Sequence, residues 1–209
     1  SAAQPDAEAR PVVVIAHGFA GSQQLMQPFA VTLARNGYLA VTFDYYGHGR
    51  NLRALAGDIT RVEGATQMLL DQTRAVVDYA LALPDAGEGL AVLGHSMASD
   101  IVVRYAETDP RVDATIAVSM FSTAVTAQSP KNLLVIVGGF EGFLKEEALR
   151  VLAMVTDNPQ EGVTAGAFEN GSARRVVFAD GVEHVGVGDH VDAMARHLAA
   201  REAIVVVDN

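Results

Sequence analysis

The chain has 209 residues, of which half are hydrophobic and 19% are charged, and its formal net charge is −10. An acidic surface repels nucleic acid and anionic membranes, and the lack of cysteine excludes disulfides, a thiolate nucleophile and cysteine metal ligands. No run approaches the ~18 apolar residues of a membrane-spanning helix, so we expect no membrane span. The length predicts one domain over residues 1–209, with residues 1–10 as an N-terminal extension. Composition leaves the compartment and the oligomeric state open.

Short β-branched runs alternate along the chain with longer amphipathic stretches, which is the pattern of βαβ units around a parallel sheet. Leu25, Phe29 and Leu33 have helical spacing, and Gly37 follows them as a stop signal. The predicted strands are 12–16, 38–44, 90–93, 114–118, 133–137 and 175–178, and the predicted helices are 24–36, 66–83, the stretch between Ser96 and Asp109, 144–155 and 191–201. The apolar run 204–207 is assigned to no element.

The sequence Gly94-His95-Ser96-Met97-Ala98 lies between an apolar strand and a helix. It matches the nucleophile-elbow pattern Gly-x-Ser-x-Gly in all but its last position. Small residues two before and two after the serine let strand and helix approach closely. Gly94 meets this requirement fully, and Ala98 meets it with one methyl group more than glycine. Such a turn lifts the serine hydroxyl clear of the sheet at a helix N-terminus, which favours developing negative charge. The alternative is that Ser96 is an ordinary N-cap.

In this setting the chain resembles an α/β-hydrolase along nearly its whole length. The matching pieces, in the family's order, are His17-Gly18-Phe19, Asp44 to Gly49, the elbow at Ser96, Gly138 to Glu141, and Glu183-His184. The resemblance implies an α/β-hydrolase fold, with a mostly parallel central sheet and helices on both faces. The short link between residues 118 and 133 leaves no room for the helical cap that many relatives carry, so we expect no cap domain.

A serine hydroxyl needs a base to become a nucleophile at neutral pH. The family order of serine, acid and histidine implies His184, in the small-residue loop after the last strand, as this base. His190 and His197 fall in the last predicted helix, and His17, His48 and His95 come too early in the chain. His17 is expected to have a structural role within its loop.

Family geometry places the acid in the loop after residues 133–137, where Glu141 stands in place of the commoner aspartate. The other usual loop, Ser119 to Ser122, holds no carboxylate. The alternatives are that Asp180 is the acid, or that Glu141 only complements the dipole of the helix after it.

The resemblance implies an oxyanion hole formed by two backbone N–H groups, and we expect these at Met97 and Phe19. An uncapped site would be open to small or partly exposed acyl groups. Tyr45, Phe121 and Phe140, in loops at the carboxyl ends of strands, are predicted to bind substrate together with these two residues. The alternative is that some of these aromatics belong to the core.

The predicted function is therefore a serine hydrolase that cleaves a carboxylic ester or a related acyl bond of a small molecule through an acyl-enzyme. No cofactor or metal is predicted, because the glycine clusters lack nucleotide-binding spacing and the histidines form no His-Glu-x-x-His pair. Two alternatives stay open: an acyltransferase that uses the same triad, and a non-catalytic binding module with a vestigial site.

Overall fold

The computed structural model describes residues 9–57, 64–120 and 133–136. In this part of the chain, five parallel strands form one sheet in the order β2-β1-β3-β4-β5. The strands are β1 (Arg10–Ala16), β2 (Leu39–Phe43), β3 (Ala86–His95), β4 (Ala114–Val118) and β5 (Leu133–Ile136). Parallel neighbours require crossover connections, and helices provide them. The helices are α1 (Gln27–Arg35), preceded by the short 3-10 helix η1 (Gln23–Met26), then α2 (Ala65–Leu81) and α3 (Met97–Thr108).

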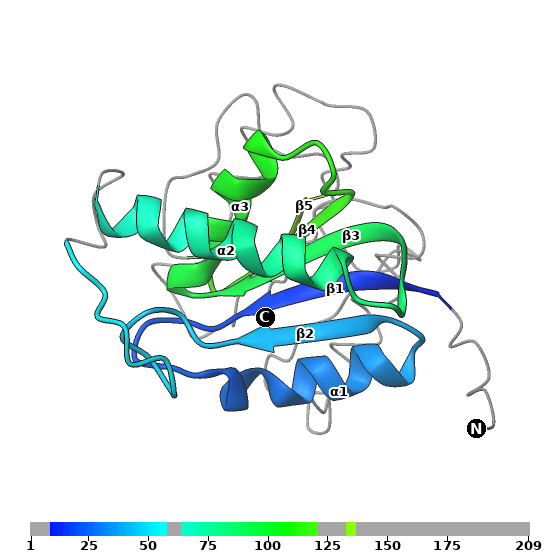
Figure 1. Ribbon diagram of the computed structural model, residues 1–209, viewed down its shortest axis with the longest axis horizontal. Helices are drawn as coiled ribbons and strands as arrows, with labels where there is room; N and C mark the ends of the chain where they lie inside the picture. Colours follow the sequence, from blue (N-terminus) through cyan, green and yellow to red (C-terminus); the bar gives the residue numbers. More distant parts are fainter. Residues whose placement is uncertain (1–8, 58–63, 121–132, 137–209) are drawn as a thin grey trace, which may run out of the picture.

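The helices cover both faces of the sheet, as Figure 1 shows, with α1 on one face and α2 and α3 on the other. Because side chains alternate along a strand, β1 supplies both cores. Val13 and Ile15 pack in the cluster that contains Leu33 of α1. Val12 and Val14 pack in the cluster that contains residues of α2 and α3, among them Leu69 and Ile101. Burial on both faces explains the continuous apolar run of this strand.

The strand order reverses between β1 and β3, because β2 lies on one side of β1 and β3 lies on the other. In open α/β sheets, ligands bind outside the carboxyl ends of the strands at such a switch point. The register pairs Ala16, the last residue of β1, with Gly94 of β3. The loop after β1 and the segment that contains Ser96 therefore emerge side by side.

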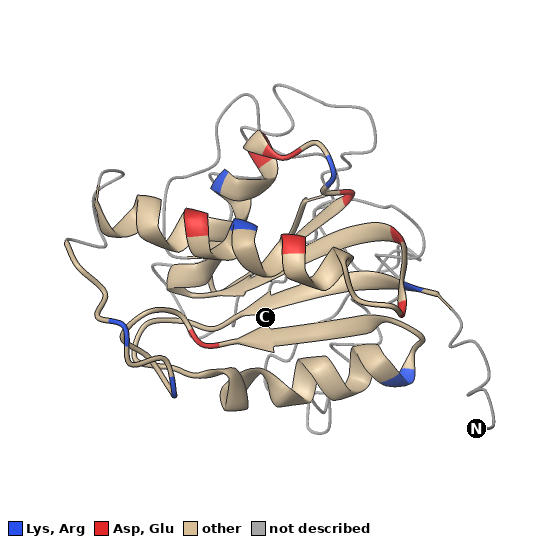
Figure 2. Ribbon diagram, viewed as in Figure 1, with Lys and Arg blue, Asp and Glu red and all other residues tan. Residues whose placement is uncertain are grey.

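The charged side chains of the described residues lie on the helices, in the loops and at strand starts, and the strand centres carry none (Figure 2). Among residues 9–57, 64–120 and 133–136, no helix has the length and apolar character that a membrane crossing needs.

The fold class predicted from the sequence is confirmed, and the five predicted strands that fall in the described part are present, with small differences at their ends. Strand β3 is longer than predicted and begins at Ala86. Its first four residues, Ala86 to Gly89, are half-buried or exposed and include two glycines and a glutamate, so no apolar pattern marks them, although Arg10 of β1 pairs with Ala86. The predicted elements beyond residue 137, and the link in which a cap would lie, are outside the described residues.

The helix predicted over residues 24–36 is divided into η1 and α1. Pro28 stands in the first turn of α1 and has no backbone N–H. A continuous α-helix from Gln24 would lack the hydrogen bond that this N–H makes in the interior. Proline is well tolerated in a first turn, where the N–H groups have no helical partner, so the α-helix begins at Gln27.

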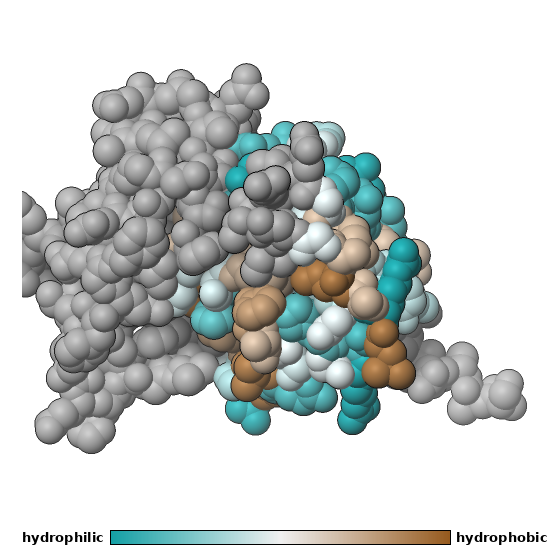
Figure 3. Space-filling view, turned by 90° about the vertical axis from the view of Figure 1, so that its left-hand side faces the viewer, coloured by the Kyte–Doolittle hydropathy of each residue, from teal (hydrophilic) through white to brown (hydrophobic). Residues whose placement is uncertain are grey.

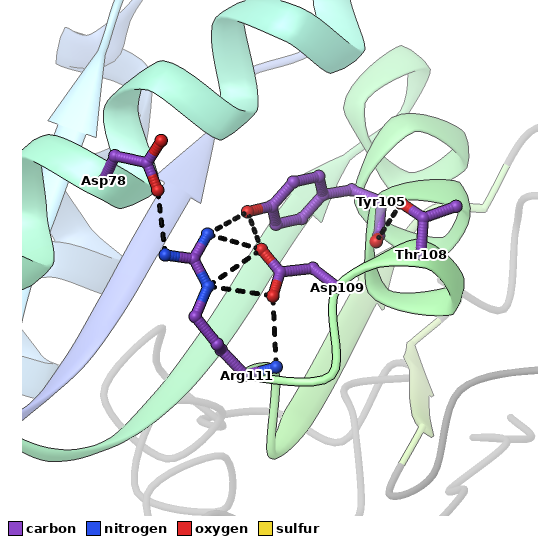
Figure 4. Close-up of polar contacts among 5 residues, drawn as sticks. All are labelled: Asp78, Tyr105, Thr108, Asp109 and Arg111. Carbon is purple, nitrogen blue, oxygen red and sulfur yellow. Dashed lines mark hydrogen bonds and ion pairs between the residues drawn. The ribbon is translucent and has the colours of Figure 1, made fainter.

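Helix α3 ends in a polar cluster that joins it to α2 and to the segment before β4 (Figure 4). Asp109 precedes Pro110 and has an extended backbone, which ends the helix as predicted. Its carboxylate accepts a hydrogen bond from the Tyr105 hydroxyl and contacts Arg111 Nη2 at 2.6 Å. Arg111 also contacts Asp78 of α2 at 2.8 Å. The hydrogen bonds from Arg111 hold the pKa of the Asp109 carboxyl well below its usual range.

Candidate active site

Ser96 occupies the turn between β3, which ends at His95, and α3, which begins at Met97. Its backbone has φ 52° and ψ −118°, a conformation that costs a non-glycine residue on the order of 1–3 kcal/mol. The surroundings maintain it, since the Ser96 N–H donates to the Val118 carbonyl of the adjacent strand at 2.8 Å. The Ser96 side chain is partly exposed and makes no N-cap hydrogen bond. Ser96 therefore stands at the N-cap position of α3, but its side chain does not cap the helix.

Gly94 is required at this turn because the backbone of α3 passes very close to it. A Cβ atom on Gly94 would lie 2.2 Å from the Ala98 carbonyl oxygen and 2.4 Å from its carbonyl carbon. Ala98, in the first turn of α3, is fully buried in the core between the sheet and helices α2 and α3, and its methyl group is accommodated there. The close approach of strand and helix predicted at Gly94 is confirmed. Ala98 is tolerated at the last position of the Gly-x-Ser-x-Gly pattern, where glycine is usual.

Ser99 is a neighbouring serine with a different role. Its hydroxyl donates to the Ser96 carbonyl at 2.5 Å, and its backbone N–H donates to the same oxygen at 2.8 Å. The residue is fully buried. Ser99 therefore supports the first turn of α3 and leaves Ser96 as the accessible hydroxyl of this segment.

The loop after β1 lies directly against the nucleophile segment. A Cβ on Gly18 would fall 2.9 Å from the Cβ of Ser96 and 3.0 Å from Nδ1 of His95, so only glycine permits this approach. The loop then turns tightly, with the Gly21 N–H donating to the Gly18 carbonyl at 3.0 Å. Phe19 lies between these glycines, and 62% of its surface is exposed.

His17 holds this loop from inside the protein. Its buried ring contacts the Gly18 carbonyl through Nδ1 at 2.7 Å, and Nε2 accepts the Tyr45 N–H at 3.1 Å. These two contacts require a neutral ring that is protonated at Nδ1. Burial lowers the pKa of His17, which outweighs the raising effect of the Gly18 hydrogen bond. The structural role predicted for His17 is confirmed.

Tyr45 does not line the site, and the prediction that it binds substrate is wrong. Its side chain is fully buried, and its hydroxyl is 2.8 Å from Oγ1 of Thr73 on α2. Its ring packs edge-on against Phe43 with the centroids 4.7 Å apart. The alternative interpretation of the aromatics, as members of the core, therefore holds for this residue.

Met97 is the first residue of α3, and its side chain is buried in the core with only 6% exposed. The first N–H groups of a helix have no partner within the helix, so the backbone of Met97 keeps the property for which it was predicted. Phe121, Phe140, Glu141 and His184, together with the alternative acid Asp180, lie outside the described residues.

Figure 3 shows the molecule from the side at which β1 and β2 end, with brown hydrophobic surface among the teal. The large apolar side chains exposed in the loops and η1 at this end are Phe19, Leu25 and Leu52. A cavity of about 340 Å³ lies at the opposite edge of the sheet, near the amino ends of the strands. Val12, Leu90 and Ala114 are among the residues that line it, and Ser96 is not. In the described part of the chain, no group of three or more histidine or acidic side chains could hold a metal ion.

Comparison with known proteins gives one family match, to serine aminopeptidase, S33, over residues 7–161. Among solved structures, the chain is similar to Est1E from Butyrivibrio proteoclasticus with bound ferulic acid, at 26% identity over 54% of this chain and 43% of that chain, with a TM-score of 0.46. It is also similar to the thioesterase domain from the curacin biosynthetic pathway, at 29% identity over 53% of this chain and 37% of that chain, with a TM-score of 0.44.

A third similar structure is an epoxide hydrolase from Vigna radiata, at 20% identity over 54% of this chain and 34% of that chain, with a TM-score of 0.44. The match spans less than half the length of each of these three structures. No curated protein matches the chain. The family match covers well over half of the residues, and the parallel sheet with its strand–turn–helix at Ser96 agrees with it. The chain belongs to the α/β-hydrolase family.

Proposed function

We propose that this protein is a serine hydrolase that cleaves a carboxylic ester or a related acyl bond through an acyl-enzyme. The observation that carries the proposal is the backbone of Ser96, with φ 52° and ψ −118° between β3 and α3. An ordinary helix N-cap has extended geometry and needs no such strain. The strained turn supports a role for an exposed hydroxyl at the carboxyl edge of the sheet.

In the proposed mechanism, Oγ of Ser96 attacks the acyl carbonyl carbon while His184 accepts the hydroxyl proton. The tetrahedral intermediate collapses when the C–O bond to the leaving group breaks, and His184 returns the proton to the departing alcohol. Water then attacks the acyl-enzyme, again with His184 as the base, and releases the acid and free Ser96. Glu141 holds the imidazole in the correct tautomer and stabilises its charged form.

The oxyanion of the intermediate would be bound by the backbone N–H groups of Met97 and Phe19. Two observations support this assignment. Met97 begins α3 directly after Ser96, and Gly18 brings the loop that contains Phe19 into contact with the Ser96 Cβ. Removal of one such donor typically lowers turnover by about 10²–10³.

The surface around Ser96 supports a proposal for the substrate class. The exposed ring of Phe19 next to the nucleophile, with Leu25 in the adjoining helix, favours an apolar or aromatic acyl group. Phe121 and Phe140 are proposed to bind the same group. The names of the family and of the similar structures widen the panel of candidate substrates to thioesters and aminoacyl amides.

Labelling with a fluorophosphonate probe tests the nucleophile. We expect the probe to label the wild-type chain at Ser96 and to leave Ser96→Ala unlabelled. The matched control is Ser22→Ala, which removes a partly buried serine hydroxyl that makes no cap contact in front of η1. This control should label like the wild type. Labelling that persists in Ser96→Ala would show that another residue is the nucleophile.

A panel of esters with graded acyl chains, extended with thioesters and aminoacyl anilides, then identifies the preferred bond. Product analysis separates a hydrolase, which releases the free acid, from an acyltransferase, which passes the acyl group to an added alcohol or amine. A protein that neither labels nor turns over any substrate would be a binding module, and the proposed function would be wrong.

A further inference from the structure

Asp44 directly follows β2 and has a carboxylate that is almost fully buried, with 8% of the residue exposed, at the edge of the sheet where Ser96 lies. Its two oxygens accept hydrogen bonds from backbone N–H groups of two different loops. The mechanism proposed above gives this carboxylate no role, and its contacts indicate a structural one.

The first set of contacts reaches the segment after β1. The Gln23 N–H donates to Oδ1 of Asp44 at 2.7 Å, and Nε2 of Gln23 donates to Oδ2 at 3.2 Å. Gln23 begins η1 and stands two residues after Gly21, which closes the tight turn from Gly18. Asp44 therefore fixes the far end of the short loop that carries Phe19.

The second set of contacts reaches the loop after β2. The Arg50 N–H donates to Oδ2 of Asp44 at 2.9 Å, and the Asp44 carbonyl accepts Nδ2 of Asn51 at 3.0 Å. Gly49 packs so closely on the carboxylate that a Cβ there would lie 2.3 Å from Asp44 Cγ. The loop after β2 is folded around the charge.

The two loops also touch through their rings. His48 lies 5.7 Å from Phe19, edge to face, and 5.1 Å from His17, between ring centroids. His17 in turn accepts the Tyr45 N–H. The ring of His48 in the loop after β2 therefore packs against the ring of Phe19, and Asp44 accepts hydrogen bonds from both loops.

A carboxylate suits this position because it only accepts hydrogen bonds and has enough lone pairs for three N–H donors. Burial raises the pKa of Asp44, but the hydrogen bonds from the Arg50 and Gln23 backbones outweigh this effect and bring the pKa below its usual value. An asparagine would turn an NH2 group toward an N–H and leave a buried donor unpaired.

We propose that Asp44 is a positioning residue for the oxyanion hole, because its carboxylate locks the loop of Phe19 onto the loop after β2. The inference rests on the serine hydrolase function proposed above. Asp44 does not touch the reacting atoms and acts through the backbone of residues 18–23. Loss of its contacts should therefore weaken transition-state stabilisation more than substrate binding.

Two variants break the contacts by independent means. Asp44→Asn removes an acceptor, and Gly49→Ala forces a methyl group into the carboxylate. Each has a matched control. Asp71→Asn makes the same chemical change at an exposed position on α2. Gly37→Ala makes the same change at another glycine of positive φ. The φ angle is 89° at Gly37 and 54° at Gly49, and a Cβ on Gly37 would meet nothing within 4 Å.

Steady-state kinetics per active site, titrated with the fluorophosphonate probe, should show kcat at least about tenfold lower for Asp44→Asn and Gly49→Ala, with KM changed by less than about twofold. The two controls should keep the wild-type kcat. A loss that appears only in KM, or only in the fraction of titratable sites, would overturn the positioning role, because general unfolding removes sites and does not slow those that remain.

Hydrogen exchange of the backbone amides of residues 18–23 separates this proposal from the proposed function. Exchange should rise in Asp44→Asn and Gly49→Ala and stay at the wild-type level in both controls. If the wild type neither labels nor hydrolyses esters, the serine hydrolase proposal is wrong, and the exchange pattern still shows whether Asp44 fixes the loop. If exchange in residues 18–23 is unchanged in both variants, the proposal for Asp44 is wrong even when the enzyme is active.

Discussion

Single residues at the carboxyl edge of the sheet differ sharply in what their local sequence reveals. Gly94, Ser96 and Ala98 form a contiguous pattern, so their arrangement could be predicted from spacing. Tyr45 and Asp44 adjoin each other in another motif, yet one is a core residue and the other joins two loops. Their partners, Thr73 and Gln23, are 28 and 21 residues away in the chain. Contacts over such distances leave no periodic signal, which is why the role of Tyr45 was predicted incorrectly.

The general base is the next residue to test by substitution. His184→Ala should lower turnover by roughly 10²–10⁴, because it removes the group proposed to accept the Ser96 proton. His190→Ala is the control, and it should retain turnover because that histidine belongs to the last predicted helix. Steady-state rates on the best ester of the panel provide the measurement. The reverse pattern would mean that the last strand has been placed several residues away from its true position.

The acid is tested by a graded series at Glu141. Glu141→Gln should keep the fold, as judged by circular dichroism, and sharply lower kcat, since an amide can leave the imidazole in the wrong tautomer. Glu141→Asp should give an intermediate rate, because the charge is kept while its reach is shortened. Asp180→Asn should have a much smaller effect. If Asp180→Asn instead abolishes turnover and the Glu141 variants are active, Asp180 is the acid.

At the scale of elements, the strands were predicted well where burial on both faces makes them apolar throughout. The prediction for β4, residues 114–118, matches the structure at both ends. The start of β3 lacked such a signal, because residues 86–89 are half-buried or exposed, and Ala86 pairs with Arg10 ahead of a register shift. The division between η1 and α1 depends on one proline, whose effect on the helix start is local and could have been anticipated.

The tight junction of β3 and α3 predicts that a single methyl group added at Gly94 strongly destabilises the fold. Gly94→Ala should lower the free energy of unfolding by about 3 kcal/mol, since the new Cβ would overlap the backbone of Ala98 and force strand and helix apart. Urea unfolding measures the change. Gly64→Ala is the control, because a Cβ there meets nothing within 4 Å although φ is 81°. Its cost should be confined to the left-handed backbone, about 1–2 kcal/mol. Equal costs at the two positions would contradict the close approach at Gly94.

At the scale of the whole molecule, buried carboxylates hold the described part of the fold together at two separated places. Asp44 joins loops at the carboxyl edge of the sheet, and Asp109 joins the end of α3 to Arg111 in the segment before β4. Hydrogen bonds bring the pKa of each below its ordinary value of 3.8. Both groups therefore bind a proton more weakly in the folded state than in the unfolded chain, and this couples the stability of the fold to pH.

The expected pH dependence follows from the sign of this difference. Because the unfolded chain binds more protons near its ordinary aspartate pKa of 3.8, the free energy of unfolding should rise with pH through this region. The stabilisation from Asp109 is fully present above the unfolded pKa and is lost as pH falls through the lower, folded-state pKa.

Asp109→Asn should be less stable than the wild type by about 1–3 kcal/mol at pH 7 and should show a shallower decline toward pH 3. Urea unfolding between pH 3 and 7 measures both quantities. Asp71→Asn, exposed on α2, should retain the wild-type decline. A curve for Asp109→Asn that runs parallel to that of the wild type would show that the cluster of Figure 4 does not couple folding to protonation.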